Sequence, residues 1–67
     1  MFQVASSAVT HLGHNGTDTL QVRFPSGDTY EYKGVSAMAF QKFVTAKSIG
    51  QHFQANIRGR YQERKLA

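Results

Sequence analysis

The sequence predicts an α+β fold, a three-stranded antiparallel meander followed by two helices packed on one sheet face. Apolar and polar residues alternate in short segments of the first half, and turn-forming residues separate these segments. In the second half, apolar residues recur three and four positions apart, which is typical of helices. The 67 residues contain no linker or repeat, so we expect a single domain over residues 1–67.

Three segments of the first half are predicted strands. The first spans Val9–His14 and ends at Asn15-Gly16, a dipeptide typical of tight reversals. The second spans Thr19–Phe24 and ends at Pro25-Ser26-Gly27, where glycine can take the left-handed conformation that closes a bulged hairpin. The third spans Thr29–Lys33. Because the connections are short, we expect neighbouring strands to be antiparallel.

Two helices are predicted in the second half. Ser36 is a suitable N-cap for a helix over residues 37–45. Ser48 and Gln51 have the spacing of a capping box, and Gly59 is a suitable end for the second helix. The segment 61–65 is then either a short strand or a disordered tail. One sheet face is expected to pack against the apolar helix residues, which are Phe40, Phe43, Val44, Phe53 and Ile57.

Composition excludes several classes of protein. There is no cysteine, so disulfides and cysteine–zinc sites are absent. The apolar runs are far shorter than the roughly 20 residues of a membrane-spanning helix. Residues 1–8 lack the basic and apolar regions of a signal peptide. We therefore expect a cytoplasmic protein with no membrane partner, in a bacterium or as a phage product in an infected cell.

Enzymatic and metal chemistry are not expected. His11 and His14 would point to opposite faces of a strand, His52 is remote, and no acidic cluster completes a metal site. No nucleophile elbow, phosphate loop or dinucleotide fingerprint is present. The sequence thus predicts a non-enzymatic protein without a metal or other cofactor.

Basic and aromatic residues point instead to a polyanion. The net charge is +4, and residues 48–67 carry four Arg and Lys against one Glu, a net charge of +3. Such a mixture can hold a nucleic-acid backbone and stack bases. The C-terminal candidates for nucleic-acid binding are Arg58, Arg60, Tyr61, Arg64 and Lys65.

A second candidate group lies on the predicted strands. Tyr30 and Tyr32 share one face and are near Arg23 and Lys33, so exposed rings could stack bases beside basic groups. The alternative is that both tyrosines pack against the helices with their hydroxyls at the rim. Tyrosines two apart on a strand more often pack in this way, so we favour the alternative slightly.

Several motifs occur together in one order along the chain. They are Ser6-Ser7, Leu12-Gly13, Leu20-x-Val22-x-Phe24, Gly27, Tyr30-x-Tyr32, Val35, Ala46-x-Ser48-x-Gly50, Phe53, Ile57-Arg58 and Tyr61. This arrangement resembles the KTSC domain, a short module named for the C-terminus of some lysyl-tRNA synthetases, over about residues 4–64. The family's pattern would have an aromatic residue at His14 and proline at Ser36. The resemblance implies the α+β fold, occurrence as small stand-alone proteins of bacteria and phages, and RNA binding by association with the synthetase.

The leading hypothesis is a small binding module for RNA or another polyanion. One alternative is a protein-interaction module, such as a phage product that binds and modulates a host enzyme through the uncovered sheet face. Another is a homo-oligomer that captures a small anionic nucleotide at subunit interfaces. In that case the helix start near Ser48 and Gly50 would cradle the phosphate.

Overall fold

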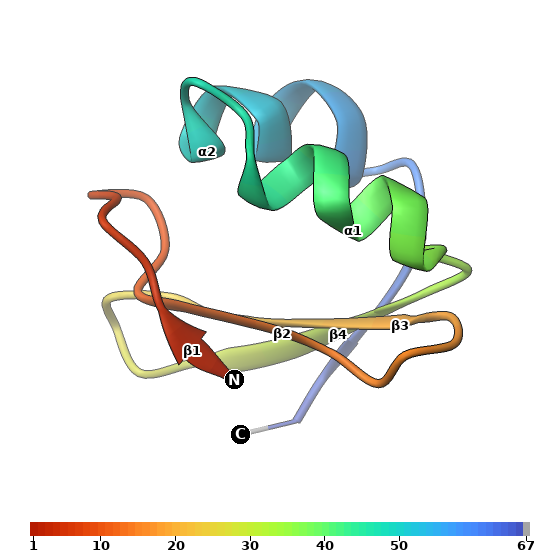
Figure 1. The fold of residues 1–67 in the computed structure, drawn as a ribbon. Helices are drawn as coiled ribbons and strands as arrows, with labels where there is room; N and C mark the ends of the chain where they lie inside the picture. The colour runs from red at the N-terminus through yellow and green to blue at the C-terminus, as the bar shows by residue number, and fades with distance from the viewer. Residues whose placement is uncertain (67) are drawn as a thin grey trace.

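The computed structural model describes residues 1–66, which form a sheet with helices on one of its faces (Figure 1). The polypeptide runs through four strands, a helical layer and a last strand. The elements are β1 (Phe2–Gln3), β2 (His11–His14), β3 (Thr19–Arg23), β4 (Thr29–Lys33), α1 (Ala37–Val44), α2 (Ile49–His52), the π-helix η1 (Phe53–Ile57) and β5 (Gln62–Lys65). The fold is therefore α+β, as predicted.

The sheet has five antiparallel strands in the order β1-β2-β3-β4-β5, so the prediction of three strands was too low. The central meander of β2, β3 and β4 is the predicted one. The two extra strands lie at the edges and have weak sequence signals. β1 has only two residues, and all four residues of β5 are exposed and polar, without an apolar face. The segment 61–65 is thus mainly strand.

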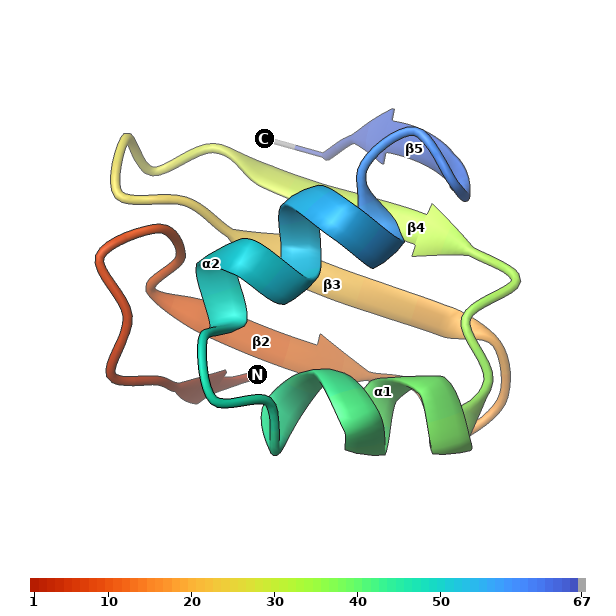
Figure 2. The same cartoon turned by 90° about the horizontal axis from the view of Figure 1, so that it is seen from above.

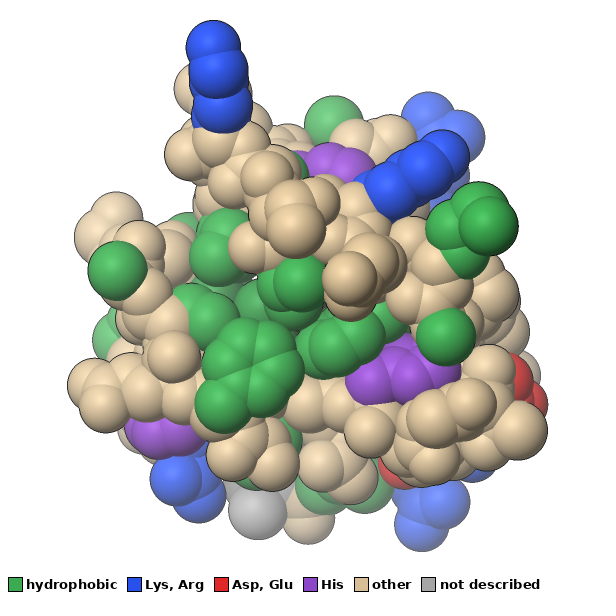
Figure 3. All heavy atoms as spheres, in the orientation of Figure 1, with side chains coloured by type: hydrophobic (Ala, Val, Ile, Leu, Met, Phe, Trp, Pro, Cys, Tyr) green, Lys and Arg blue, Asp and Glu red, His purple; other side chains and the backbone are tan. Residues whose placement is uncertain are grey.

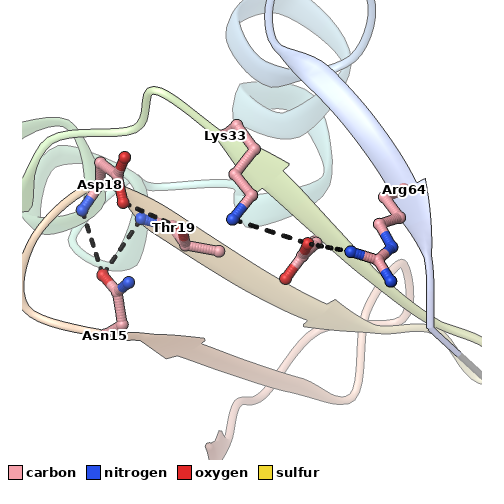
Figure 4. A network of polar contacts seen from close by, with 6 residues as sticks. Asn15, Asp18, Thr19, Lys33 and Arg64 are labelled. Atoms are coloured by element: carbon pink, nitrogen blue, oxygen red, sulfur yellow. Dashed lines mark hydrogen bonds and ion pairs between the residues drawn. The ribbon is translucent and has the colours of Figure 1, made fainter.

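The first predicted strand is shorter than expected. β2 begins at His11, although Val9 is fully buried and the amide of Thr10 donates to the carbonyl of Arg23 at 2.8 Å. The turn after β2 is held by the side-chain oxygen of Asn15. It accepts from the amides of Thr17, Asp18 and Thr19 at 2.9–3.1 Å, and Figure 4 shows the last two of these bonds.

The helical layer consists of two antiparallel segments (Figure 2). Ser36 caps α1 as predicted, its hydroxyl accepting from the amide of Ala39 at 3.1 Å. Ser48 likewise accepts from the amide of Gln51 at 3.2 Å. The second helix is not a regular α-helix, because α2 continues into η1. The wider π turn is closed by the amide of Arg58, which donates to the carbonyl of Phe53 at 2.8 Å.

The core lies between the helical layer and one face of the sheet. β2, β3 and β4 contribute buried residues that alternate with polar ones, and the helices contribute residues spaced along one side. The helices leave the opposite face of the sheet uncovered (Figure 1). The core residues are Val9, Leu12, Leu20, Val22, Tyr32, Val35, Phe43, Phe53 and Ile57.

Candidate nucleic-acid interface

The structure divides the nine predicted nucleic-acid residues among three places. Three lie on the uncovered sheet face, three line a pocket at the β4–β5 edge, one pairs with a carboxylate of that pocket, and two line a hollow in the helical layer. The uncovered face carries Arg23, Lys33 and Arg64. The pocket is lined by Tyr30, Tyr32 and Arg58, and Lys65 pairs with its Asp28. The hollow is lined by Arg60 and Tyr61.

We define the basic sheet face as the side chains of Arg23, Lys33 and Arg64. Each residue alternates with a residue whose side chain faces the helices, so all three side chains lie on the uncovered face. They come from three neighbouring strands, β3, β4 and β5, and all three are exposed. Residues distant in sequence therefore form one positively charged surface.

One carboxylate lies among these cations. Glu31 Oε1 is 3.8 Å from Lys33 Nζ and 3.7 Å from Arg64 Nη1. Figure 4 shows both cationic side chains directed at this carboxylate above the strands. Pairs of this length at a surface contribute little to stability. Glu31 therefore offsets part of the charge of these cations and leaves the face with a net positive charge.

The tyrosines of β4 do not form a stacking platform on the open face. Both side chains face the helices. Tyr32 is only 2% exposed and packs edge-on against Phe53, with ring centroids 5.7 Å apart. Tyr30 is half-buried and packs edge-on against Phe24 at 5.7 Å. The favoured interpretation, in which both tyrosines pack on the helix side, is therefore confirmed, and Tyr32 is no candidate for base stacking because its ring is part of the core.

The hydroxyl end of Tyr32 lies in a polar environment at the sheet edge. Burial, followed by the nearby carboxylate of Glu63, raises the pKa of Tyr32 to about 12. Its side chain lines a pocket of about 270 Å³ with Glu63, Asp28 and Arg58. Lys65 Nζ lies 3.7 Å from Asp28 Oδ1. Carboxylates thus offset Arg58 and Lys65, which makes this pocket a poor polyanion site.

Arg60 and Tyr61 lie at a different surface, which we call the cationic hollow. Its volume is about 530 Å³, and its lining consists of Ser36, Met38, Ala39, Lys42, His52, Asn56, Ile57, Arg60 and Tyr61. No carboxylate belongs to this lining. Lys42, His52 and Asn56 were not among the predicted nucleic-acid residues. Two four-residue spacings, His52–Asn56 and Asn56–Arg60, are the signal that could have identified this side of the helix.

The histidines lie apart. His11 is on the uncovered face, whereas His14 stacks on Phe40 on the helix side, with ring centroids 5.1 Å apart. The opposite orientation predicted for these two residues is therefore confirmed. In residues 1–66, no group of three or more His, Asp or Glu residues is placed to hold a metal ion. No helix in this part of the chain is long and apolar enough to cross a bilayer.

An apolar edge is present where β1 approaches α1. Phe2 is 47% exposed and packs edge-on against Phe40, with ring centroids 6.1 Å apart. Figure 3 shows hydrophobic side chains gathered on this side, between the helices and the sheet, with Lys and Arg mostly at the periphery. Part of the exposed apolar surface therefore lies at this edge.

The helix start near Ser48 and Gly50 has its N-cap occupied and no charged side chain in the hollow beside it. The Ser48 hydroxyl already accepts the Gln51 amide, and α2 has only four residues. The adjoining hollow contains no cation among its lining residues, which are Ala8, Ser48, Gly50, Gln51, Gln54 and Ala55. Within a single chain, this hollow therefore offers no cationic side chain to a phosphate.

Comparison with known proteins identifies the family. The KTSC domain model matches residues 5–61. A crystal structure of a KTSC domain protein from Yersinia pestis superimposes with a TM-score of 0.93 at 33% sequence identity, covering 98% of this chain and 94% of that one. A lysine–tRNA ligase from Nostoc punctiforme is 37% identical over 51 residues, which are 76% of this chain but 9% of the ligase. The chain therefore belongs to the KTSC domain family.

Proposed function

We propose that this KTSC domain is a small non-enzymatic module that binds RNA in the bacterial cytoplasm through its basic sheet face. The observation that carries the proposal is the grouping of Arg23, Lys33 and Arg64 on one uncovered face around a single carboxylate. A positively charged surface suits the phosphate backbone and places no demand on base sequence. The aromatic stacking expected from the β4 tyrosines is not part of this mode.

The similarity to a lysine–tRNA ligase supports RNA as the polyanion. The ligase acts on tRNA according to its name, and this chain matches only 9% of its length. A module of this size attached to such an enzyme is well suited to hold RNA near it. The contribution of the domain would be affinity, supplied by charge, while the rest of the enzyme performs the chemistry.

The direct test is binding of a short single-stranded RNA, measured by fluorescence anisotropy over a series of salt concentrations. Binding by this face should weaken steeply with salt, because phosphate contacts release counterions. Lys33→Gln and Arg64→Gln should each weaken binding about threefold to tenfold and reduce the salt slope by about one.

Lys47→Gln is the matched control, because Lys47 is exposed, lies in the connection between α1 and α2, and changes the net charge equally. This variant should bind RNA within about twofold of the parent protein. Binding that is insensitive to salt would contradict the proposal. So would equal weakening by Lys47→Gln and Arg64→Gln.

A protein-interaction module is the second candidate, and the exposed Phe2 against Phe40 favours it. Affinity purification from the host cell with and without nuclease separates the two functions. Recovery of RNA that depends on Arg64 supports the first function. A single protein retained after nuclease, and lost in Phe2→Asp, supports the second.

A further inference from the structure

The helical layer has a site of its own at the end where α1 begins and η1 ends. Figure 2 shows α1 and the second helical segment running in opposite directions, so that these two ends are neighbours. The cationic hollow lies there and is lined by the N-cap of α1, by α1 itself, by α2 and η1, and by the segment that leads to β5. Its volume of about 530 Å³ is in the usual range for small-molecule sites.

The charges of the hollow are not compensated. Lys42 and Arg60 both line it, and neither takes part in an ion pair within residues 1–66. The first turn of α1 carries no acidic residue, so the positive end of its dipole adds to the field along the rim. Figure 3 shows no Asp or Glu side chain over the helices on the side in view. An anionic group is therefore the complementary ligand.

The rest of the lining suits a flat ring. Met38 and Ala39 provide apolar surface, and the ring of Tyr61 lies near Gly34, where a Cβ would come within 3.8 Å of Tyr61 Cδ1. Inorganic phosphate would leave this surface unused. A base stacked on Tyr61 would cover it while its phosphate contacts Lys42 or Arg60.

A polar group is also available to contact the edge of a base. The side-chain nitrogen of Asn56 donates to His52 Nδ1 at 3.5 Å, which leaves the Asn56 carbonyl oxygen as an acceptor in the hollow. His52 is held in turn by stacking on Phe43, with ring centroids 5.4 Å apart. Asn56 lies in η1, and π turns occur frequently at functional sites.

We propose that the cationic hollow binds a nucleoside monophosphate unit, with the phosphate on Lys42 and Arg60 and the base against Tyr61 and Asn56. The unit is either a free nucleotide or the phosphorylated end of an RNA strand, because the two share this chemistry. The site has no residue in common with the basic sheet face and lies on the opposite side of the sheet.

The test is a titration of the isotopically labelled full chain with adenosine 5′-monophosphate, followed by amide chemical shifts. Shifts should concentrate at Lys42, Asn56, Arg60 and Tyr61. Arg60→Gln and Lys42→Gln should each weaken binding at least about fivefold, a loss typical for a charged hydrogen bond. Lys47→Gln, at the opposite end of the helical layer, should stay within about twofold.

Two further probes test the two halves of the ligand. Adenosine and ribose 5-phosphate should each bind at least about fivefold more weakly than the complete nucleotide, because each lacks one group of contacts. Equal binding of ribose 5-phosphate would overturn the proposal and leave a simple anion site. Shifts centred on Arg23, Lys33 and Arg64 would overturn it too, while leaving the basic sheet face intact.

Competition distinguishes the two sources of the nucleotide. Displacement of the nucleotide by a 5′-phosphorylated oligoribonucleotide, but not by its 5′-hydroxyl form, supports an RNA end as the ligand. Binding of the nucleotide with no displacement by either strand supports a free nucleotide. Tighter binding of a phosphotyrosine peptide than of the nucleotide would replace this inference with a protein ligand.

Discussion

At the scale of single residues, Tyr32 shows how one side chain joins the core to the polar edge. Its ring packs on Phe53 inside the domain, while its hydroxyl end shares a pocket with Glu63 and Arg58. Burial and the adjacent carboxylate both disfavour the phenolate. Burial of its ring excludes Tyr32 from base stacking, and its raised pKa links stability to pH.

The pH dependence of stability is the first prediction at this scale. Because the pKa of Tyr32 rises from 10.0 to about 12 on folding, the unfolded chain releases this proton first. The contribution of Tyr32 to the free energy of unfolding is therefore complete below about pH 10 and is lost as the pH rises toward 12. Urea unfolding of the parent protein should show this loss, and Tyr32→Phe should show a shallower one. Parallel losses in both proteins would contradict the assignment.

At the scale of elements, the start of the second helix is positioned by a close contact with the loop before β2. Gly50 lies inside α2, and a Cβ placed there would come within 2.9 Å of the Cβ of Ala8. Glycine is normally unfavourable in a helix relative to alanine by about 1 kcal/mol. Here it allows the helix to approach the loop, so tertiary packing outweighs helix propensity.

A swap of the two residues tests this packing. Gly50→Ala should lower the free energy of unfolding by about 1 kcal/mol, because overpacking at the contact exceeds the gain in helix propensity. The double variant Ala8→Gly/Gly50→Ala should recover most of that loss, since the methyl group is moved across the contact. Urea unfolding measures both. A more stable Gly50→Ala single variant would show that the loop yields freely.

At the scale of the whole molecule, the sheet separates two chemically different sides. The helix side contains the core, the apolar edge and the cationic hollow, whereas the uncovered side carries the basic sheet face. Glu31 is the carboxylate that pairs with Lys33 and Arg64 on that face. It therefore competes with any polyanion for the same cations.

Removal of this carboxylate should strengthen RNA binding, the opposite of the effect expected for the cation variants. Glu31→Gln should lower the dissociation constant about twofold to fivefold at low salt, equivalent to releasing an exposed ion pair of about 0.2–1 kcal/mol. Anisotropy with the same RNA measures it. Unchanged or weaker binding in a stably folded Glu31→Gln variant would place the RNA elsewhere, and the cationic hollow would become the surface to test first.

Much of the fold could be predicted because its signals are local. Alternation identified the central strands, Ser36 and Ser48 identified the helix starts, and the helical spacing of Phe53 and Ile57 identified their buried side. Of the edge strands, β1 was not predicted and the segment 61–65 was left as either a strand or a disordered tail, since the pairing of an edge strand depends on its neighbour and not on its own pattern. The π turn was missed because Phe53 and Ile57 have the same four-residue spacing in a regular helix.

The candidate sites required the tertiary structure. The sequence by itself determined the excess of basic residues, the strand–helix order and the family pattern, all of which follow from residue type and spacing. It grouped Arg60 and Arg64 because they are neighbours in the chain. The fold places Arg64 on the basic sheet face and Arg60 in the cationic hollow. The pairing of β5 with β4 decides the position of Arg64, because strand alternation determines the side of the sheet that its side chain occupies, whereas Arg60 lies in the turn between η1 and β5.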